Sequence, residues 1–154
     1  MGLTELLRAD CVQLGLPPLS KEETIRTMVD ALGQAGVVES PAQVVRALLE
    51  RERVMSTGVG GGIALPHALS PAALSFGVAF ARPRTPINFE ALDGQPVNQI
   101  FLVVGPDDRA VLMKILTRIS RLLYGGELQK KILKVKTPEE FIKLIAAEEA
   151  RIGA

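Results

Sequence analysis

The chain of 154 residues has few of the residues that mark several common kinds of site. It contains one cysteine, Cys11, one histidine, His67, and no tryptophan. A single cysteine excludes an intrachain disulfide framework and is typical of a reducing, cytoplasmic compartment. One histidine excludes most histidine-rich metal sites, so we expect no bound metal. Aromatic residues make up only 4% of the chain, which leaves few rings to stack on bases or sugars.

The chain also lacks an excess of charge of either sign. Eighteen Lys and Arg face seventeen Asp and Glu, for a net charge of +1. A dedicated nucleic-acid binder normally carries a concentrated basic stripe, so we expect no nucleic-acid partner. Hydrophobic residues make up 47%, enough for a packed core. The length is that of about one domain, and we expect a single domain over residues 1–154.

One long stretch carries no Asp, Glu, Lys or Arg, from Val54 to Ala81. Its glycines and prolines would break a membrane-spanning helix repeatedly, so it reads as a loop region joined to a buried strand. The first residues lack the basic start and apolar run of a signal peptide. We therefore expect a cytoplasmic protein with no direct membrane insertion.

Helix-start signals lie on both sides of the centre of the chain. Capping boxes occur at 20–23 and 137–140, where a hydroxyl and a glutamate can each satisfy a free backbone N–H. Gly33 or Gly36 would end the first of these helices, and a second helix starts at 40–43 with proline in its first turn. Asp107 or Asp108 caps a long helix that ends at the glycine pair 125–126.

Strand signals fill the centre. Short apolar runs at 62–66, 73–81 and 99–104 predict strands, with a turn at 93–96 before the last of them. Helices on either side of a strand-rich centre predict a helix–sheet–helix sandwich, an α/β architecture in three layers.

The segment from Ser56 to His67 reads Ser-Thr-Gly-Val-Gly-Gly-Gly-Ile-Ala-Leu-Pro-His and is the most distinctive part of the chain. It has no lysine, which a Walker phosphate loop requires, and Ile63 stands where the dinucleotide fingerprint has its third glycine. The predicted strand also follows the glycines rather than preceding them. Nucleotide binding is therefore not expected.

The imidazole of His67 is the one candidate nucleophile in this segment. Pro66 holds its approach extended, and an imidazole is largely neutral at the pH of the cell, which leaves one ring nitrogen free to react. Hydroxyls of Ser56 and Thr57 and nearby glycine amides could bond a phosphoryl group, and Arg51 and Arg53 could neutralise it. A lone histidine at a strand end is more often structural, so the residues alone leave both interpretations open.

The same segment, together with Arg51-Glu52, closely resembles the active-site segment of the fructose/mannitol/nitrogen-type enzyme IIA domain of the bacterial phosphotransferase system. Residues 48–52, 87–97 and 115–123 also fall in the order of that family, and residues 89–97 are more similar to its nitrogen-regulatory branch than to its sugar-transporting branches. The resemblance covers nearly the whole chain. It implies a mixed β-sheet flanked by helices on both faces.

The resemblance also implies a phosphoryl carrier. In the family the histidine matching His67 accepts phosphate from the phosphohistidine of an HPr-type carrier protein. The arginine matching Arg51, sixteen positions earlier, supports the phosphorylated site, and the residues matching Ser56, Thr57 and Gly58 line the phosphate pocket. Phosphohistidine is itself an activated donor, so the resemblance implies no cofactor and no metal.

One position departs from the family pattern. Leu112 stands where members usually carry a second histidine at the start of the long helix, and Arg109 or Lys114 could take its place as a cation. Two alternatives to a carrier in nitrogen or metabolic regulation therefore stay open. One is a sugar-specific IIA that passes phosphate to a IIB partner. The other is a regulatory binding module in which Leu112 has impaired phosphorylation.

Overall fold

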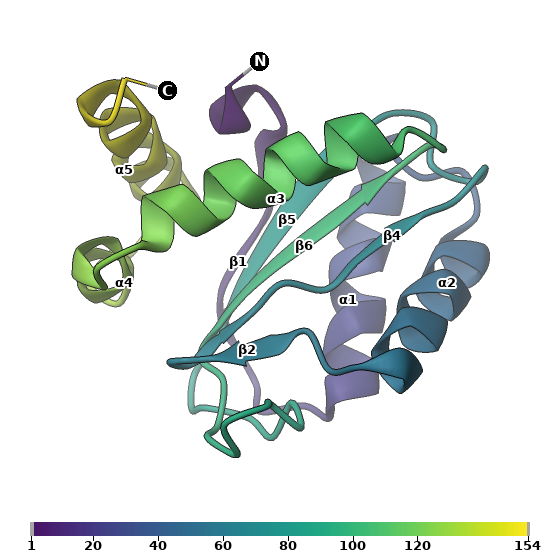
Figure 1. Ribbon diagram of the computed structural model, residues 1–154, viewed down its shortest axis with the longest axis horizontal. Helices are drawn as coiled ribbons and strands as arrows, with labels where there is room; N and C mark the ends of the chain where they lie inside the picture. Colours follow the sequence, from purple (N-terminus) through teal and green to yellow (C-terminus); the bar gives the residue numbers. More distant parts are fainter. Residues whose placement is uncertain (1, 154) are drawn as a thin grey trace.

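The computed structural model describes residues 2–153, and its centre is a six-stranded mixed sheet (Figure 1). The strands follow the order β1-β5-β6-β3-β2, and β4 pairs with β6 beyond the end of β3. Their bounds are β1 Leu7–Leu16, β2 Gly58–Gly60, β3 Ile63–Ala64, β4 His67–Leu69, β5 Gly77–Pro83 and β6 Gln99–Gly105. Because β2 pairs only with β3, the outer edge of β4 has no strand beside it.

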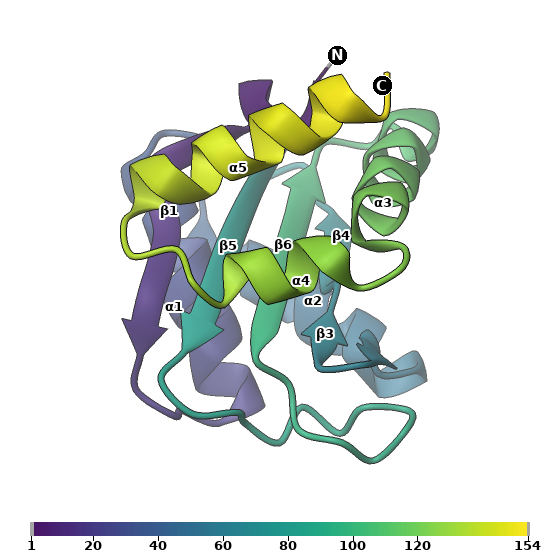
Figure 2. The same ribbon diagram turned by 90° about the vertical axis from the view of Figure 1, so that its left-hand side faces the viewer.

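Helices cover both faces of this sheet, as Figures 1 and 2 show. On one face lie α1 and α2; on the other lie α3, α4 and α5, with the short 3-10 helix η1 beside α3. Their bounds are η1 Leu3–Glu5, α1 Lys21–Gln34, α2 Pro41–Val54, α3 Arg109–Leu123, α4 Glu127–Ile132 and α5 Pro138–Arg151. The predicted fold class, a mixed sheet between two helical layers, is confirmed.

Each face of the sheet has its own apolar core. Under α1 and α2 the core contains Ile25, Val44 and Leu48 with alternate residues of the strands. On the other face Phe80 packs against Phe101 edge-on and stacks on Phe141 of α5, with ring centroids 4.8 and 4.2 Å apart. Burying rings of this size supplies much of the free energy that holds α5 on the sheet.

The predicted helix starts are largely confirmed. Ser20 Oγ accepts from Glu23 N at 3.1 Å while the Glu23 carboxylate accepts from Ser20 N at 3.2 Å, so the first capping box is complete. Asp108, not Asp107, caps α3 by accepting from Val111 N at 3.2 Å.

The second capping box forms only in part. Thr137 Oγ1 accepts from Glu140 N at 3.1 Å, but the Glu140 carboxylate accepts from Lys136 N, one residue before the cap. Reciprocal capping at this helix start was therefore a wrong expectation, because Lys136 N–H lies within reach of the same carboxylate.

One predicted strand has different bounds in the structure, and another strand was not predicted. The strand expected over 73–81 runs from Gly77 to Pro83, because Ala73 is held in an isolated bridge to Val38 instead. The edge strand β1 was not expected at all. Among the described residues, no helix is both long and apolar enough to span a membrane.

Candidate functional site

His67 is the first residue of β4 and projects toward the helical layer of α3. Its paired residue on β6 is Val103, and paired residues of parallel strands point to the same face. Val103 belongs to the core under α3, as do the alternating neighbours Leu65 and Leu69, whereas Ala68 packs into the opposite core. The imidazole is half-buried at the open edge of the sheet, so a donor can reach it.

A short hydrogen bond fixes the tautomer of this imidazole. His67 Nδ1 lies 2.7 Å from the carbonyl oxygen of Leu65. A carbonyl oxygen can only accept, so Nδ1 carries a hydrogen. In the neutral form of the ring the lone pair is therefore on Nε2, and the hydrogen bond orients that nitrogen as the nucleophile.

A chain of hydrogen bonds leads from this imidazole to a buried ion pair. Leu65 N–H donates to Thr57 O at 2.9 Å, and Thr57 N–H donates to Glu52 Oε1 at 3.1 Å. The same Oε1 lies 2.7 Å from Lys21 Nζ, with both side chains largely buried. The start of α1 and the last turn of α2 thus anchor the loop that sets the position of His67.

The three predicted pocket residues next to this chain differ in what they can still bond. Ser56 donates its hydroxyl hydrogen to Phe89 O at 3.1 Å, and Gly58 N–H donates to Ser56 Oγ at 3.1 Å. Neither the Ser56 hydroxyl nor the Gly58 N–H is therefore free to bond a phosphoryl oxygen. Thr57 Oγ1 is buried and has no hydrogen-bond partner among the described residues. Of the two hydroxyls in the set, it is the one without a hydrogen bond to a described residue.

Gly58 has a packing reason for its identity. A Cβ at this position would lie 2.8 Å from both Cα and Cβ of Ala91, closer than real contacts allow. Glycine here lets the loop after α2 pass against the 87–91 segment.

The other glycines of the segment serve a different part of the molecule. Gly60, Gly61 and Gly62 all have positive φ and form the turn between β2 and β3, beside the start of β6. Gly61 N–H donates to Asp93 Oδ2 at 3.1 Å. Bonds from Gln95 N–H and then Gly61 N–H hold the pKa of Asp93 below its usual value. These three glycines do not cradle His67, which pairs farther along β6.

Arg51 lies in the last turn of α2, and its side chain is exposed. It forms no hydrogen bond or ion pair of its side chain with any residue in the range 2–153. The guanidinium is thus free to turn to an anion, and α2 packs directly against β4. Its neighbour Glu52 points inward, one helical step away.

The position of the absent second histidine lies on the face to which His67 points. Leu112 belongs to the same core as Val103, and Leu65 and Leu69 pack against this core. Arg109 precedes Leu112 by three residues and shares its side of α3, whereas Lys114 follows by two and lies roughly 200° around the axis. Lys114 lines a groove against η1 instead. Of the two candidate cations, only Arg109 lies on the His67 side of the helix.

Sequence reasoning included Glu52 in the family resemblance but assigned it no role, and it missed Lys21 as part of the site. The signal that could have found Glu52 was its inward position beside Leu48 and Leu49 in an otherwise charged helix end. Lys21 gave none, because its pairing with Glu52 and its position 5.0 Å from the Phe89 ring centroid depend on how α1 packs against α2.

The site therefore has a half-buried histidine with one ring nitrogen held by a hydrogen bond and the other free of such a bond among the described residues. This arrangement can carry a chemical group on the imidazole. Residues 5–148 match the family described as phosphoenolpyruvate-dependent sugar phosphotransferase system, EIIA 2. The chain therefore belongs to this family of phosphoryl carriers, which are phosphotransferase components.

Individual relatives come from two branches of the family. The chain is 33% identical over 146 residues to the fructose-specific EIIABC component of Bacillus subtilis, covering 94% of this chain but only 23% of that protein. It is 30% identical over 151 residues to a nitrogen regulatory protein of Bradyrhizobium diazoefficiens, covering 97% and 98% of the two chains. The crystal structure of the nitrogen regulatory protein IIA-Ntr from Neisseria meningitidis superposes with a TM-score of 0.86 at 26% identity, covering 92% and 97%.

Proposed function

We propose that this chain carries a phosphoryl group on Nε2 of His67. The observation behind the proposal is the 2.7 Å contact between His67 Nδ1 and Leu65 O, which leaves Nε2 as the reactive nitrogen. Members of the family work with HPr-type proteins and IIB domains. The donor in our proposal is accordingly the phosphohistidine of an HPr-type protein, at a cytoplasmic location.

The transfer step follows from this geometry. The Nε2 lone pair attacks phosphorus, the phosphorus–nitrogen bond to the donor imidazole breaks, and the donor nitrogen recovers the electron pair. The hydrogen on His67 Nδ1 stays in its bond to Leu65 O throughout. Thr57 Oγ1 and the guanidinium of Arg51 then stabilise the dianion on His67, because phosphoryl transfer requires mainly in-line positioning and charge neutralisation.

Phosphorylation by purified components tests this proposal. The chain is incubated with enzyme I, an HPr-type carrier and labelled phosphoenolpyruvate. We expect an acid-labile, base-stable label on the wild type and none on His67→Ala, with a phosphorus resonance of an Nε2-phosphohistidine. A folded wild-type protein that takes up no label refutes the carrier role and leaves the regulatory binding module as the explanation of Leu112.

For the branch, we propose nitrogen or metabolic regulation with the chain acting as a single IIA domain over 1–154. Support comes from the nitrogen regulatory protein of Bradyrhizobium diazoefficiens, which matches over nearly the full length of both chains. The fructose-specific relative supports a second candidate, in which a sugar-specific IIB protein receives the phosphate. Rapid transfer from phosphorylated His67 to a sugar-specific IIB domain would favour the second candidate over the first.

Arg109 is proposed to supply the cation that the family's second histidine would provide. It shares the side of α3 on which Leu112 faces the His67 strand. We expect Arg109→Ala to shorten the phosphohistidine lifetime and Lys114→Ala to leave it unchanged. Unchanged rates and lifetimes in both variants would show that neither residue compensates for Leu112.

A further inference from the structure

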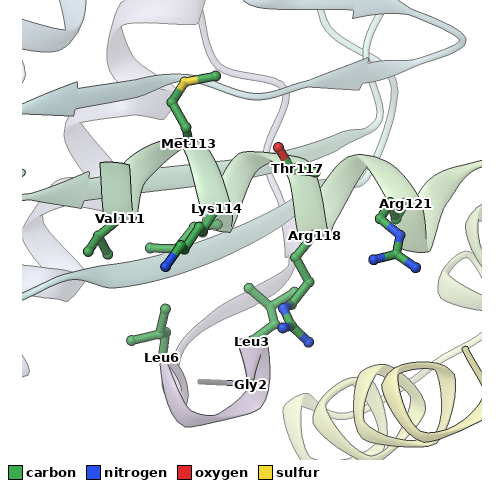
Figure 3. Close-up of a pocket in the computed structure, with 10 residues that line it drawn as sticks. Gly2, Leu3, Leu6, Val111, Met113, Lys114, Thr117, Arg118 and Arg121 are labelled. Atoms are coloured by element: carbon green, nitrogen blue, oxygen red, sulfur yellow. The ribbon is translucent and has the colours of Figure 1, made fainter. Parts of the chain in front are cut away.

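A groove of about 530 Å³ lies between η1 and one flank of α3 (Figure 3). Its floor is apolar, since Leu3 and Ile115 are buried there and Leu6 and Val111 are half-buried beside them. Lys114, Arg118 and Arg121 form its α3 wall. The groove therefore combines an apolar floor with a cationic wall.

The groove is already formed and held in place by one buried carboxylate. Glu149 of α5 accepts from Leu3 N–H at 2.6 Å and from Thr4 N–H at 3.2 Å, and it lies 3.3 Å from Arg118 Nη1. It thus ties η1 to α3 through α5. An occupant would not have to order these walls, which lowers the cost of binding.

The charged residues that line the groove are all cations. Glu149 neutralises Arg118 in part, but Lys114 and Arg121 form no ion pair within the described residues. The spacing 114, 118 and 121 places the three charges along one side of α3 over roughly 10 Å. A chain with a net charge of only +1 thus concentrates unpaired positive charge beside accessible hydrocarbon.

This side of α3 faces away from His67. Figure 3 shows Lys114 and Arg118 on the side of the helix where Leu3 and Leu6 lie. Figure 1 shows η1 on one side of α3 and β4 on the other. An occupant of the groove would therefore leave the imidazole accessible.

We propose that the groove docks an acidic amphipathic helix of a partner protein. Apolar side chains of that helix rest on the floor, and carboxylates spaced by three and four residues face the three cations, which is the repeat of a helix laid along α3. A small anion would use the cations and leave the floor uncovered. A flat lipid surface would likewise reach the charges without filling the groove. The proposal is independent of phosphate transfer.

Binding of a designed peptide tests the proposal. The probe is a fluorescent, hydrocarbon-stapled helix of about 15 residues, with leucines on one face and glutamates at i, i+4 and i+7 beside them, because shorter or unstapled helices are marginal in water. We expect saturable binding by the full chain and at least about tenfold weaker binding of the matched peptide with glutamine for glutamate. Amide shifts in the bound state should map to Leu3, Leu6 and residues 111–121.

Charge reversal supplies the matched controls. Lys114→Glu with Arg121→Glu should weaken binding at least about tenfold, whereas Lys134→Glu with Lys143→Glu should change it less than about twofold, although both pairs alter net charge equally. Circular dichroism checks that each variant is folded. Equal binding of the glutamate and glutamine peptides, equal loss in both variants, or shifts centred on β4 would each overturn the proposal. The proposal would also be overturned if the protein bound phosphatidylglycerol vesicles in a way that depends on Lys114 and Arg121 but did not bind the peptide.

Discussion

At the scale of single residues, removing the Thr57 hydroxyl should affect the stability of the fold and the lifetime of phosphohistidine in different ways. Its Oγ1 is buried without a partner, and an unbonded buried hydroxyl destabilises a fold. Thr57→Val keeps the shape and removes the hydroxyl, so we expect the free energy of unfolding to stay equal or rise by up to about 1 kcal/mol. If Oγ1 bonds the phosphoryl group, the phosphohistidine lifetime should fall in the same variant. Urea unfolding and the decay of labelled protein measure the two effects.

Thr57→Ser is the control for this prediction, since it keeps the hydroxyl. A valine variant with the wild-type phosphohistidine lifetime would contradict a phosphate-binding role for Thr57 and leave its hydroxyl without an assigned function.

Two substitutions of Glu52 distinguish the effect of its charge on stability from its role in positioning His67. Glu52→Gln keeps an acceptor for Thr57 N–H but leaves the ammonium of Lys21 with the carboxylate of Glu90, at 3.8 Å, as its one anionic partner among the described residues, and we expect a loss of about 1–3 kcal/mol in unfolding free energy. Glu52→Leu also removes the acceptor, which frees Thr57 and, through Leu65, the imidazole. The phosphorylation rate should therefore fall much more in Glu52→Leu than in Glu52→Gln.

Denaturant unfolding and initial rates of labelling measure these effects, and Glu50→Gln, exposed on the same helix, serves as the control. Equal labelling rates in the two Glu52 variants would mean that the hydrogen-bond chain from Glu52 does not orient His67.

At the scale of elements, Glu148 links α5 to α4 and gives the fold a pH dependence. Arg151 at 2.9 Å, followed by Lys131 at 3.5 Å, lowers the pKa of the Glu148 carboxyl below its ordinary value. The unfolded chain therefore takes up this proton first as the pH falls. The stabilisation is complete above the unfolded pKa, near 4.5, and is lost as the pH falls through the lower folded value.

We expect Glu148→Gln to cost up to about 1 kcal/mol at neutral pH, a small effect because both cations are largely solvated. The difference from the wild type should shrink as the pH falls below about 4.5 and vanish once the Glu148 carboxyl is protonated in the folded protein too, as measured by urea unfolding across the pH range. Glu139→Gln, on the exposed face of α5, should change little at any pH. A Glu148→Gln deficit that persists in acid would mean that packing, not charge, is responsible.

Elements with a clear period or cap could be predicted from the sequence, and those without one could not. The helices α1, α2, α3 and α5 begin at or next to the expected caps, and β6 is a continuous apolar run. The strand β1 escaped because a register shift between Leu7 and Val12 puts these two residues, five apart, into the same core, which breaks the period of two expected of a strand. β4 is only three residues long, too short for any period to appear.

Burial explains the character of Cys11 in the same strand. Cys11 lies in the core, and burial raises the pKa of its thiol to about 11, chiefly through loss of hydration. A protonated, enclosed thiol is unreactive.

At the scale of the whole molecule, the two candidate sites differ in how much the sequence could tell. The residues around His67 come mainly from one continuous segment, so the motif carries them together. The groove joins the first residues of the chain to α3, which are more than a hundred residues apart, and only the fold unites them. Both sites share α3, with His67 on one side and the cationic wall on the other, which raises the question of how they influence each other.

We expect phosphorylation of His67 to change the affinity of the groove for the acidic peptide by less than about twofold. The cations and the new dianion lie on opposite sides of a helix about 10 Å across, and because these groups are exposed or half-buried, salt with a Debye length of about 8 Å largely screens their interaction. Linkage requires the peptide to alter phosphate transfer equilibrium by the same small factor. Titrating the peptide against phosphorylated and unphosphorylated protein at about 0.15 M salt measures the coupling. A tenfold difference would mean instead that α3 moves between two positions when His67 is phosphorylated, and that the domain reports its phosphorylation state through the groove.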